Sequence, residues 1–288
     1  MTKLIWDHPA NRGRRGRALV DMALWQTWKR TVGRPFGLTV YGDMKFRAYS
    51  DSSQPGRFIY FGGIPDYAEM MFMRRYLRAG DGFIDGGANE GMFTLLAGKL
   101  VGATGAVCAF EAVPAYANRL RENVRANGLS WVTVHPDALG AEPGTTPFVV
   151  RGAGSRIQTA DDHGPSARLV DVRVVRLDDA LPERSWAMGK LDVEGAEHRV
   201  LAGAEALLAR AEPAVWMLEL VEHFLVRFGS SVTTVREWLG DHRYDLAYYD
   251  PGAGRLKPAP DPLSMPPNVF AVARERWAEV AARLRPSS

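Results

Sequence analysis

The amino-acid sequence predicts an α/β fold in which a mostly parallel sheet of seven strands carries helices on both faces. Three apolar runs, each followed by a helical pattern, support this prediction, and they end at Ile84, Phe110 and Val193. Buried parallel strands read as continuous apolar segments, and a helix usually returns the chain from one strand to the next. With 288 residues, 46% of them hydrophobic, the chain can form one large domain of this kind with an appendage.

The first unit, Phe83-Ile84-Asp85-Gly86-Gly87-Ala88-Asn89-Glu90-Gly91, reads as a strand, a tight turn and the start of a helix. Its glycines tolerate positive φ and lack a Cβ, so we expect a ligand to lie directly against the amides of the turn. A dinucleotide turn needs Gly-x-Gly-x-x-Gly, and Ala88 interrupts that pattern. The carboxylate of Asp85 suits a sulfonium ligand with an ammonium group, such as S-adenosylmethionine, better than a pyrophosphate. The alternative is a glycine-rich turn without a ligand.

The second unit ends in Glu111, at the tip of the apolar run 105–110. Ligands of open α/β sheets bind outside the carboxyl ends of the strands, and an acid about 20 residues beyond the turn can accept from both ribose hydroxyls. The spacing from Gly91 to Glu111 fits this role. Alternatively, Glu111 caps the helix that begins near Pro114.

Four segments resemble the FkbM family of S-adenosylmethionine-dependent methyltransferases. They are residues 83–91, 109–111, 137–140 and, as the most specific, Lys190-Leu191-Asp192-Val193-Glu194-Gly195-Ala196-Glu197. The likeness runs over about residues 81–273. Gly86 stands where the family usually has valine, and Ala112 where a proline often follows the acid. Neither departure removes a group that would bind a ligand.

This resemblance implies the Rossmann-like class I methyltransferase fold, S-adenosylmethionine as cofactor, and methylation of a hydroxyl on a sugar or a polyketide-like natural product. It implies that Asp137 and Ala138 meet the adenine, although Asp137 could be an ordinary turn residue. The cofactor-binding candidates are Glu69, Asp85, Gly87, Asn89, Gly91, Glu111, Asp137 and Ala138. An N-methyltransferase of a small molecule, a nicotinamide-dependent oxidoreductase and a non-catalytic binding protein are the alternatives.

The catalytic candidates follow the fourth and fifth strands, expected at 188–193 and 214–218. Asp192 and Glu194 share period two with Lys190, so a regular strand directs all three to one side. Glu219 ends the fifth strand, and His223 follows one turn later. Clustered carboxylates raise one another's pKa, so one of them can take the acceptor's proton near neutrality. His223 as base, a divalent metal on the carboxylates, and a purely structural Lys190–Asp192 ion pair are the alternatives.

Residues 1–79 are expected to form a cap or edge extension of the catalytic domain, residues 80–288. A helix is expected at 18–30, and short aromatic segments at 38–41, 45–49 and 57–61 suggest a small antiparallel sheet. The helix 18–30 could contact a membrane surface or an anionic substrate, or it could pack on its own domain. Glu69, in a helix expected at 66–78, contacts the cofactor or is an ordinary surface carboxylate.

Beyond the third strand, at 131–134, the segment 144–176 reads as an insertion with strands at 148–150 and 169–175 and a loop at 152–167. Helices are expected at 115–127, 196–209, 235–239 and 274–285, and the last two strands at 244–249 and 268–273. A proline-rich loop, 251–267, separates these strands.

The net charge and the number of cysteines limit which partners and which cellular compartment we expect. A net charge of +3 does not indicate a polyanionic partner, and the fourth strand lacks the Pro-Pro-aromatic segment that stacks a flipped base, so a nucleic-acid substrate is not expected. One cysteine, Cys108, excludes an intrachain disulfide. Lys99 breaks the apolar stretch after Gly91, so we expect no membrane span and a cytoplasmic protein whose oligomeric state is open.

Overall fold

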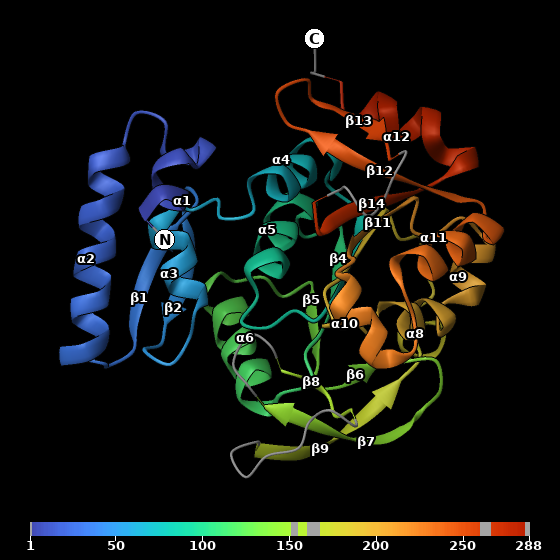
Figure 1. Cartoon of the computed structure of the whole chain (residues 1–288), viewed down its shortest axis with the longest axis horizontal. Helices are drawn as coiled ribbons and strands as arrows, with labels where there is room; N and C mark the ends of the chain where they lie inside the picture. Colours follow the sequence, from blue (N-terminus) through green and yellow to red (C-terminus); the bar gives the residue numbers. More distant parts are fainter. Residues whose placement is uncertain (1, 151–154, 160–167, 260–265, 286–288) are drawn as a thin grey trace.

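The computed structural model describes residues 2–150, 155–159, 168–259 and 266–285. Its centre is an eight-stranded sheet in the order β13-β12-β14-β11-β10-β3-β4-β5 (Figure 1). In chain order these strands are β3 (Gly82–Gly86), β4 (Ala106–Phe110), β5 (Val132–His135), β10 (Met188–Leu191), β11 (Val215–Glu219), β12 (Tyr244–Asp250), β13 (Arg255–Pro258) and β14 (Asn268–Ala273). Pairing is parallel from β11 to β5 and antiparallel along β11, β14, β12 and β13.

The predicted Rossmann-like class I architecture is confirmed, with one more strand than expected. The seven expected strands are present, and β13 adds an eighth at the edge. It lies inside the segment 251–267, which we had expected to be a loop because of its prolines. Pro258 ends β13 at the edge of the sheet, where a residue without an amide hydrogen is tolerated.

Helices cover both faces of the sheet. On one face, core side chains come from α4 (Tyr67–Tyr76), α5 (Met92–Val101), α6 (Pro114–Ala126) and α12 (Trp277–Arg283). On the other face they come from α7 (Leu177–Ala180), α8 (Glu197–Ala202), α9 (Glu205–Ala209), α10 (Glu222–Leu225) and α11 (Val232–Asp241). The single helix expected at 196–209 is two helices, because the chain bends at Gly203. A Cβ there would lie 2.1 Å from the Gly140 carbonyl oxygen.

The N-terminal residues form a unit beside α6, in the blue part of Figure 1. It contains α1 (Thr2–Asp7), α2 (Arg15–Thr31), the antiparallel pair β1 (Phe36–Val40) and β2 (Met44–Ala48), and α3 (Gln54–Tyr60). Residues 57–61 were predicted as a strand, and this was wrong because most of them belong to α3. Pro55, whose ring fixes a helical φ, lies in the first turn of α3 and outweighs the aromatic pattern.

A second, four-stranded sheet lies at the bottom of Figure 1. Its strands, in the order β6-β9-β7-β8, are β6 (Ala138–Leu139), β7 (Gly144–Val150), β8 (Arg156–Ile157) and β9 (Arg168–Val175). The inserted strands are therefore confirmed. Of the loop expected at 152–167, residues 155–159 are described and include β8, and the rest lies outside the described residues.

Phe72 joins α4 to the sheet, so its truncation tests this packing. Its ring is fully buried, with centroids 4.3 Å from Phe270, 5.3 Å from Tyr76 and 5.4 Å from Tyr249. We expect Phe72→Ala to lower the free energy of unfolding in urea by about 3–5 kcal/mol. Val226→Ala, at a side chain that is 59% exposed, should change it by less than about 0.5 kcal/mol. Similar losses in the two variants would contradict the packing.

Candidate active site

The turn after β3 is held against the neighbouring strand ends. Gly87 has φ +76°, and a Cβ built on it would lie 1.9 Å from the Asp192 carbonyl oxygen. The amides of Gly87 and Ala88 donate to the Phe110 carbonyl at 3.0 and 2.9 Å, and the Asn89 amide donates to the Glu111 carboxylate. These amides, which we expected to contact a ligand, thus already have partners within the protein. Gly87 is needed for the close approach of the turn to the end of β10.

An open cavity lies above this turn. It is at the carboxyl ends of the central strands, where β3 separates β4 from β10 and the order of the sheet reverses. Such a switch point is where open α/β sheets bind ligands. The predicted site residues that line it are Gly87, Asn89, Glu111, Asp137, Ala138, Asp192, Glu194 and Glu219.

Glu111 is a buried acid on the β4 side of the cavity. Its two carboxylate oxygens accept from the amides of Asn89 and Val113, each at 2.8 Å. Burial raises the pKa of Glu111 to about 7, although these two bonds oppose the rise. Each carboxylate oxygen has a further lone pair, so Glu111 is able to accept from ribose hydroxyls. Apolar side chains beside it, including Phe110 and Leu139, offer a surface for an adenine.

Asp137 lies at the same side, but its carboxylate already has a partner. Nε and Nη2 of Arg173 donate to its two oxygens at 2.7 and 2.8 Å, and Asp137 is 3% exposed. Sequence reasoning missed Arg173. This residue lies on β9, and only the pairing of β9 with β6 in the second sheet brings it next to Asp137. An adenine amine would share this carboxylate with the guanidinium.

Three other cofactor candidates lie outside the cavity lining. Asp85 is fully buried beneath the turn, accepts from the Thr94 hydroxyl at 2.6 Å, and has its pKa raised by burial. Gly91 provides packing space, because a Cβ there would lie 2.4 Å from Cδ1 of Leu120. Glu69 lies in the first turn of α4, and burial raises its pKa while an interaction with Asn268 opposes the rise.

The acidic residues at the ends of β10 and β11 come together as predicted from their positions. Carboxylate oxygens of Asp192, Glu194 and Glu219 lie within 4.8 Å of one another. Burial, followed by the charge of Asp192, raises the pKa of Glu194 to about 7 and that of Glu219 to about 8. The set is suited to exchanging a proton near neutral pH, and its spacing also allows a divalent cation.

Lys190 connects this acidic set to the cofactor turn. Its Nζ lies 3.2 Å from Asp192 and 3.7 Å from Asp85. Burial alone would lower the pKa of Lys190, but Asp192 and Asp85 outweigh it and raise that pKa. His223, by contrast, is exposed on α10 and does not line the cavity, so the structure does not bring it to the carboxylates.

Sequence reasoning also missed lining residues from the two parts outside the main sheet. Gln54 and Arg57 come from α3 in the N-terminal unit, and Phe148 and Ile157 come from the inserted sheet. No motif marks these positions, and only tertiary packing brings them to the cavity. A helical reading of residues 54–60 would have placed Gln54 and Arg57 on one helix face, three positions apart.

The reversal of strand order at β3, the acid-tipped glycine turn and the acids ending β4, β10 and β11 fit the class I S-adenosylmethionine-dependent methyltransferases. A profile described as the methyltransferase FkbM domain matches residues 85–246, more than half of the chain. The chain therefore belongs to the FkbM methyltransferase family, as the sequence motifs predicted.

Solved structures of low sequence identity are similar to the chain. One is a methyltransferase FkbM from Methylobacillus flagellatus KT, with 13% identity, a TM-score of 0.42, and coverage of 89% of this chain and 60% of that one. Another is an S-adenosylmethionine-dependent O-methyltransferase from Thermotoga maritima, with 15% identity, a TM-score of 0.41, and coverage of 72% and 64%. The chain thus spans less than two thirds of the length of either protein.

A methyltransferase from Streptococcus mutans, solved in complex with S-adenosylhomocysteine, is 11% identical with a TM-score of 0.42, over 71% of this chain and 94% of that one. No curated protein sequence matches the chain. Within the described residues, none of the helices combines the length and apolar character that a membrane crossing requires.

Gly87→Ala tests whether the close approach of the turn matters for cofactor binding. The added methyl group would clash with the Asp192 carbonyl and force the turn away from β10. We expect the Kd for S-adenosylhomocysteine, measured by calorimetry, to rise about tenfold or more, since about 1–2 kcal/mol of distortion is enough. Gly128→Ala is the matched control, because Gly128 also has positive φ but has open space around it. Equal Kd values for both variants would contradict this role of Gly87.

Proposed function

We propose that the protein transfers a methyl group from S-adenosylmethionine to a hydroxyl oxygen of a sugar or a polyketide-like natural product. The observation that carries this proposal is the cluster of Asp192, Glu194 and Glu219 at the cavity wall. An alcohol must lose its proton as it is methylated, so it needs a base with a pKa near the working pH. Glu194 and Glu219, with pKa values raised to about 7 and about 8, meet that need.

The cavity fits S-adenosylmethionine in the chemistry of its walls. Glu111 would accept from the ribose, and the adenine would lie by Ala138 and Leu139. The carboxylates at the ends of β10 and β11 complement the positive charges of the sulfonium and ammonium groups. When bound, the cofactor supplies an electrophilic methyl group.

The proposed step is a direct displacement. The acceptor oxygen forms a bond to the methyl carbon while the carbon–sulfur bond breaks, and the sulfur keeps the electron pair. The hydroxyl proton passes to Glu219, whose pKa the charges of Asp192 and Glu194 help to raise. Lys190 keeps Asp192 in place through their 3.2 Å contact. We assign the base to Glu219 because its pKa, about 8, is higher than that of Glu194, about 7.

Transfer of a labelled methyl group tests the reaction. The purified protein is incubated with S-adenosylmethionine labelled in its methyl group and with hydroxyl- and amine-bearing acceptors. Label on oxygen is the expected result. Label on nitrogen alone would favour an N-methyltransferase, and no transfer combined with calorimetric binding of a nicotinamide dinucleotide would favour an oxidoreductase.

The pH dependence of turnover tests the base. The base must be deprotonated to accept a proton, so we expect turnover to rise with pH and then level off. The apparent pKa of this rise should be no higher than about 8, because a bound sulfonium lowers the pKa of Glu219. Glu219→Gln should lower kcat by about 10²-fold or more and abolish this rise, while the Kd for S-adenosylhomocysteine changes little. The control is Glu237→Gln, at an exposed position of α11. If the Glu219→Gln variant retains the pH profile, the base is another group.

A further inference from the structure

Gln54 lines the cavity from the N-terminal unit and has an unused hydrogen-bonding group. Its side chain is buried, being 6% exposed, and its Oε1 accepts no hydrogen bond from the residues that the structure describes. A buried carbonyl oxygen without a donor is costly, and a ligand that supplies an O–H or N–H group removes that cost. The position of Gln54 is therefore that of a group which recognises a ligand.

The ion pairs of the two cationic lining residues favour a neutral ligand. Among the described lining residues, the cationic side chains are Arg57 and Lys190. Arg57 is paired with Asp66, and Lys190 is paired with Asp85 and Asp192. The charge of Asp192 acts on the pKa of Asp66, so the Arg57–Asp66 pair lies near the acidic set. An anionic acceptor would be repelled by the carboxylates, and it would find Arg57 and Lys190 already paired.

A chain of hydrogen bonds joins Gln54 to the cofactor turn. The backbone amide of Gln54 donates to Oγ of Ser52 at 3.1 Å, and the Ser52 hydroxyl donates to Oε2 of Glu90 at 2.6 Å. Glu90 is the residue between Asn89 and Gly91, and its own amide donates to Oδ1 of Asn89. Two hydrogen bonds thus connect the backbone of Gln54 to a side chain of the turn.

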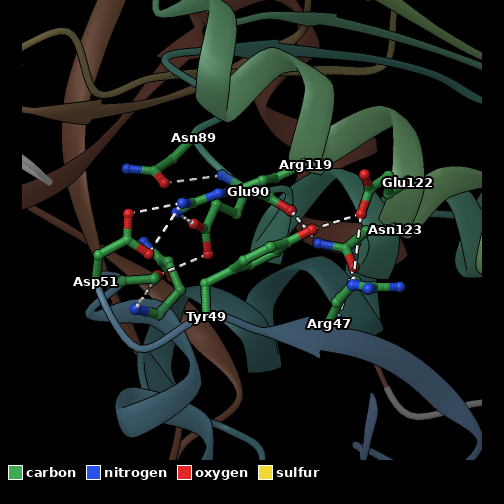
Figure 2. Close-up of polar contacts among 10 residues, drawn as sticks. Arg47, Tyr49, Asp51, Asn89, Glu90, Arg119, Glu122 and Asn123 are labelled. Atoms are coloured by element: carbon green, nitrogen blue, oxygen red, sulfur yellow. Dashed lines mark hydrogen bonds and ion pairs between the residues drawn. The ribbon is translucent and has the colours of Figure 1, made fainter. Parts of the chain in front are cut away.

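Arg119 of α6 reinforces this connection (Figure 2). Its Nη1 donates to Oε1 of Glu90 at 2.7 Å, and its Nη2 donates to both oxygens of Asp51 at 2.7 and 2.9 Å. The Glu90 carboxylate is 1% exposed, so its two contacts form in a largely water-free environment. One of the two partners that compensate its burial, Ser52, is present only while residues 51–54 stay docked.

A second link between the same two parts runs through Glu122, which does not touch the turn, and Asn123, which also donates to the Glu90 carbonyl at 2.8 Å. The Tyr49 hydroxyl donates to Glu122, and Oδ1 of Asn123 accepts from the Arg47 amide at 2.8 Å, both on α6 (Figure 2). Because Glu122 makes a docking contact without touching residues 87–91, it allows docking and coupling to be tested separately.

We propose that Gln54 is an acceptor-recognising residue and that Glu90 positions it in response to the cofactor. This proposal rests on the methyl transfer proposed above. Oε1 of Gln54 accepts a hydrogen bond from a second hydroxyl of a neutral, polyhydroxylated acceptor. A cofactor that fixes the turn also fixes Glu90, then Ser52 and Gln54. The acceptor subsite is therefore completed by cofactor binding, and the cofactor binds before the acceptor.

Hydrogen exchange with S-adenosylhomocysteine tests the coupling. In the wild-type protein the ligand should slow exchange of the amides at 52–57 as well as those at 87–91, by up to about 100-fold at about 100 times its Kd. Glu90→Gln should lose most of the slowing at 52–57 and, because coupling is reciprocal, raise the Kd about tenfold. Ser52→Ala leaves the Glu90–Arg119 pair intact, and it should likewise reduce the slowing at 52–57 and raise the Kd.

Glu122→Gln is the matched control, since it weakens docking at Tyr49 but leaves the turn untouched. It should preserve both the Kd and the slowing at 52–57. Unchanged exchange at 52–57 in the wild-type protein, or equal losses for Glu90→Gln and Glu122→Gln, would overturn the coupling.

Monodeoxy methyl hexopyranosides test the role of Gln54. With labelled S-adenosylmethionine, the wild type should prefer the parent glycoside about tenfold in kcat/KM over the analogue that lacks the hydroxyl next to the methylated one. Gln54→Leu should lose this preference at an unchanged Kd for S-adenosylhomocysteine. Gln26→Leu, at a glutamine of α2 that does not line the cavity, should retain it.

Two outcomes would overturn the role of Gln54: a Gln54→Leu variant that keeps the preference, and a wild type that labels none of the glycosides. Label found only on amines would instead refute the proposed hydroxyl acceptor, while the exchange result would still decide the coupling through Glu90.

Discussion

The site depends on Lys190, a buried ammonium that lies between carboxylates from two neighbouring strand ends. Its Nζ is 3.7 Å from Asp85 on β3 and 3.2 Å from Asp192 after β10, and it lies 5.1 Å from the ring centroid of Phe93. A buried charge without a partner costs several kcal/mol, so the two buried groups, Lys190 and Asp85, are tolerated because of each other and of the half-buried Asp192. The cofactor turn and the loop that carries Glu194 are thereby fixed relative to each other.

The same arrangement determines how the cavity handles charge. Lys190 offsets Asp85 and Asp192, so it lowers the pKa values of Glu194 and Glu219 less than burial and Asp192 raise them. A bound sulfonium adds positive charge and favours the ionised carboxylates. Methyl transfer removes that positive charge as a proton reaches the cluster. In the proposed step the cluster therefore carries one negative charge fewer when the product leaves than when the sulfonium is bound.

The sequence was sufficient to predict the parts of the site that depend on the sheet alone. Parallel strands bring their carboxyl ends to one edge, so Glu111, Asp192 and Glu219 could be placed together without knowledge of any loop. What a side chain meets there depends on tertiary packing. Asp137 lies at the cavity, but its partner Arg173 comes from the inserted sheet, which the motif does not reveal. The helix at residues 54–60 was misread because its aromatic residues suit a strand, and with it Gln54 was missed.

The central sheet, which the sequence predicts, and the parts that depend on tertiary packing differ physically, and this difference also bears on acceptor specificity. The central sheet is built from buried apolar strands, so its geometry leaves little freedom, and it fixes where a cofactor with constant chemistry is bound. In the proposed binding mode the acceptor side is formed by α3 and the inserted sheet. Phe58 anchors α3 in the apolar core, and the residues just before α3 make polar contacts such as Ser52–Glu90 and Arg119–Asp51. Polar contacts of this kind hold a segment in place without prescribing the residues that it presents to the cavity. Acceptor choice can therefore change through positions such as 54 and 57 while the cofactor site stays the same, which is why the fold identifies the reaction class before it identifies the acceptor.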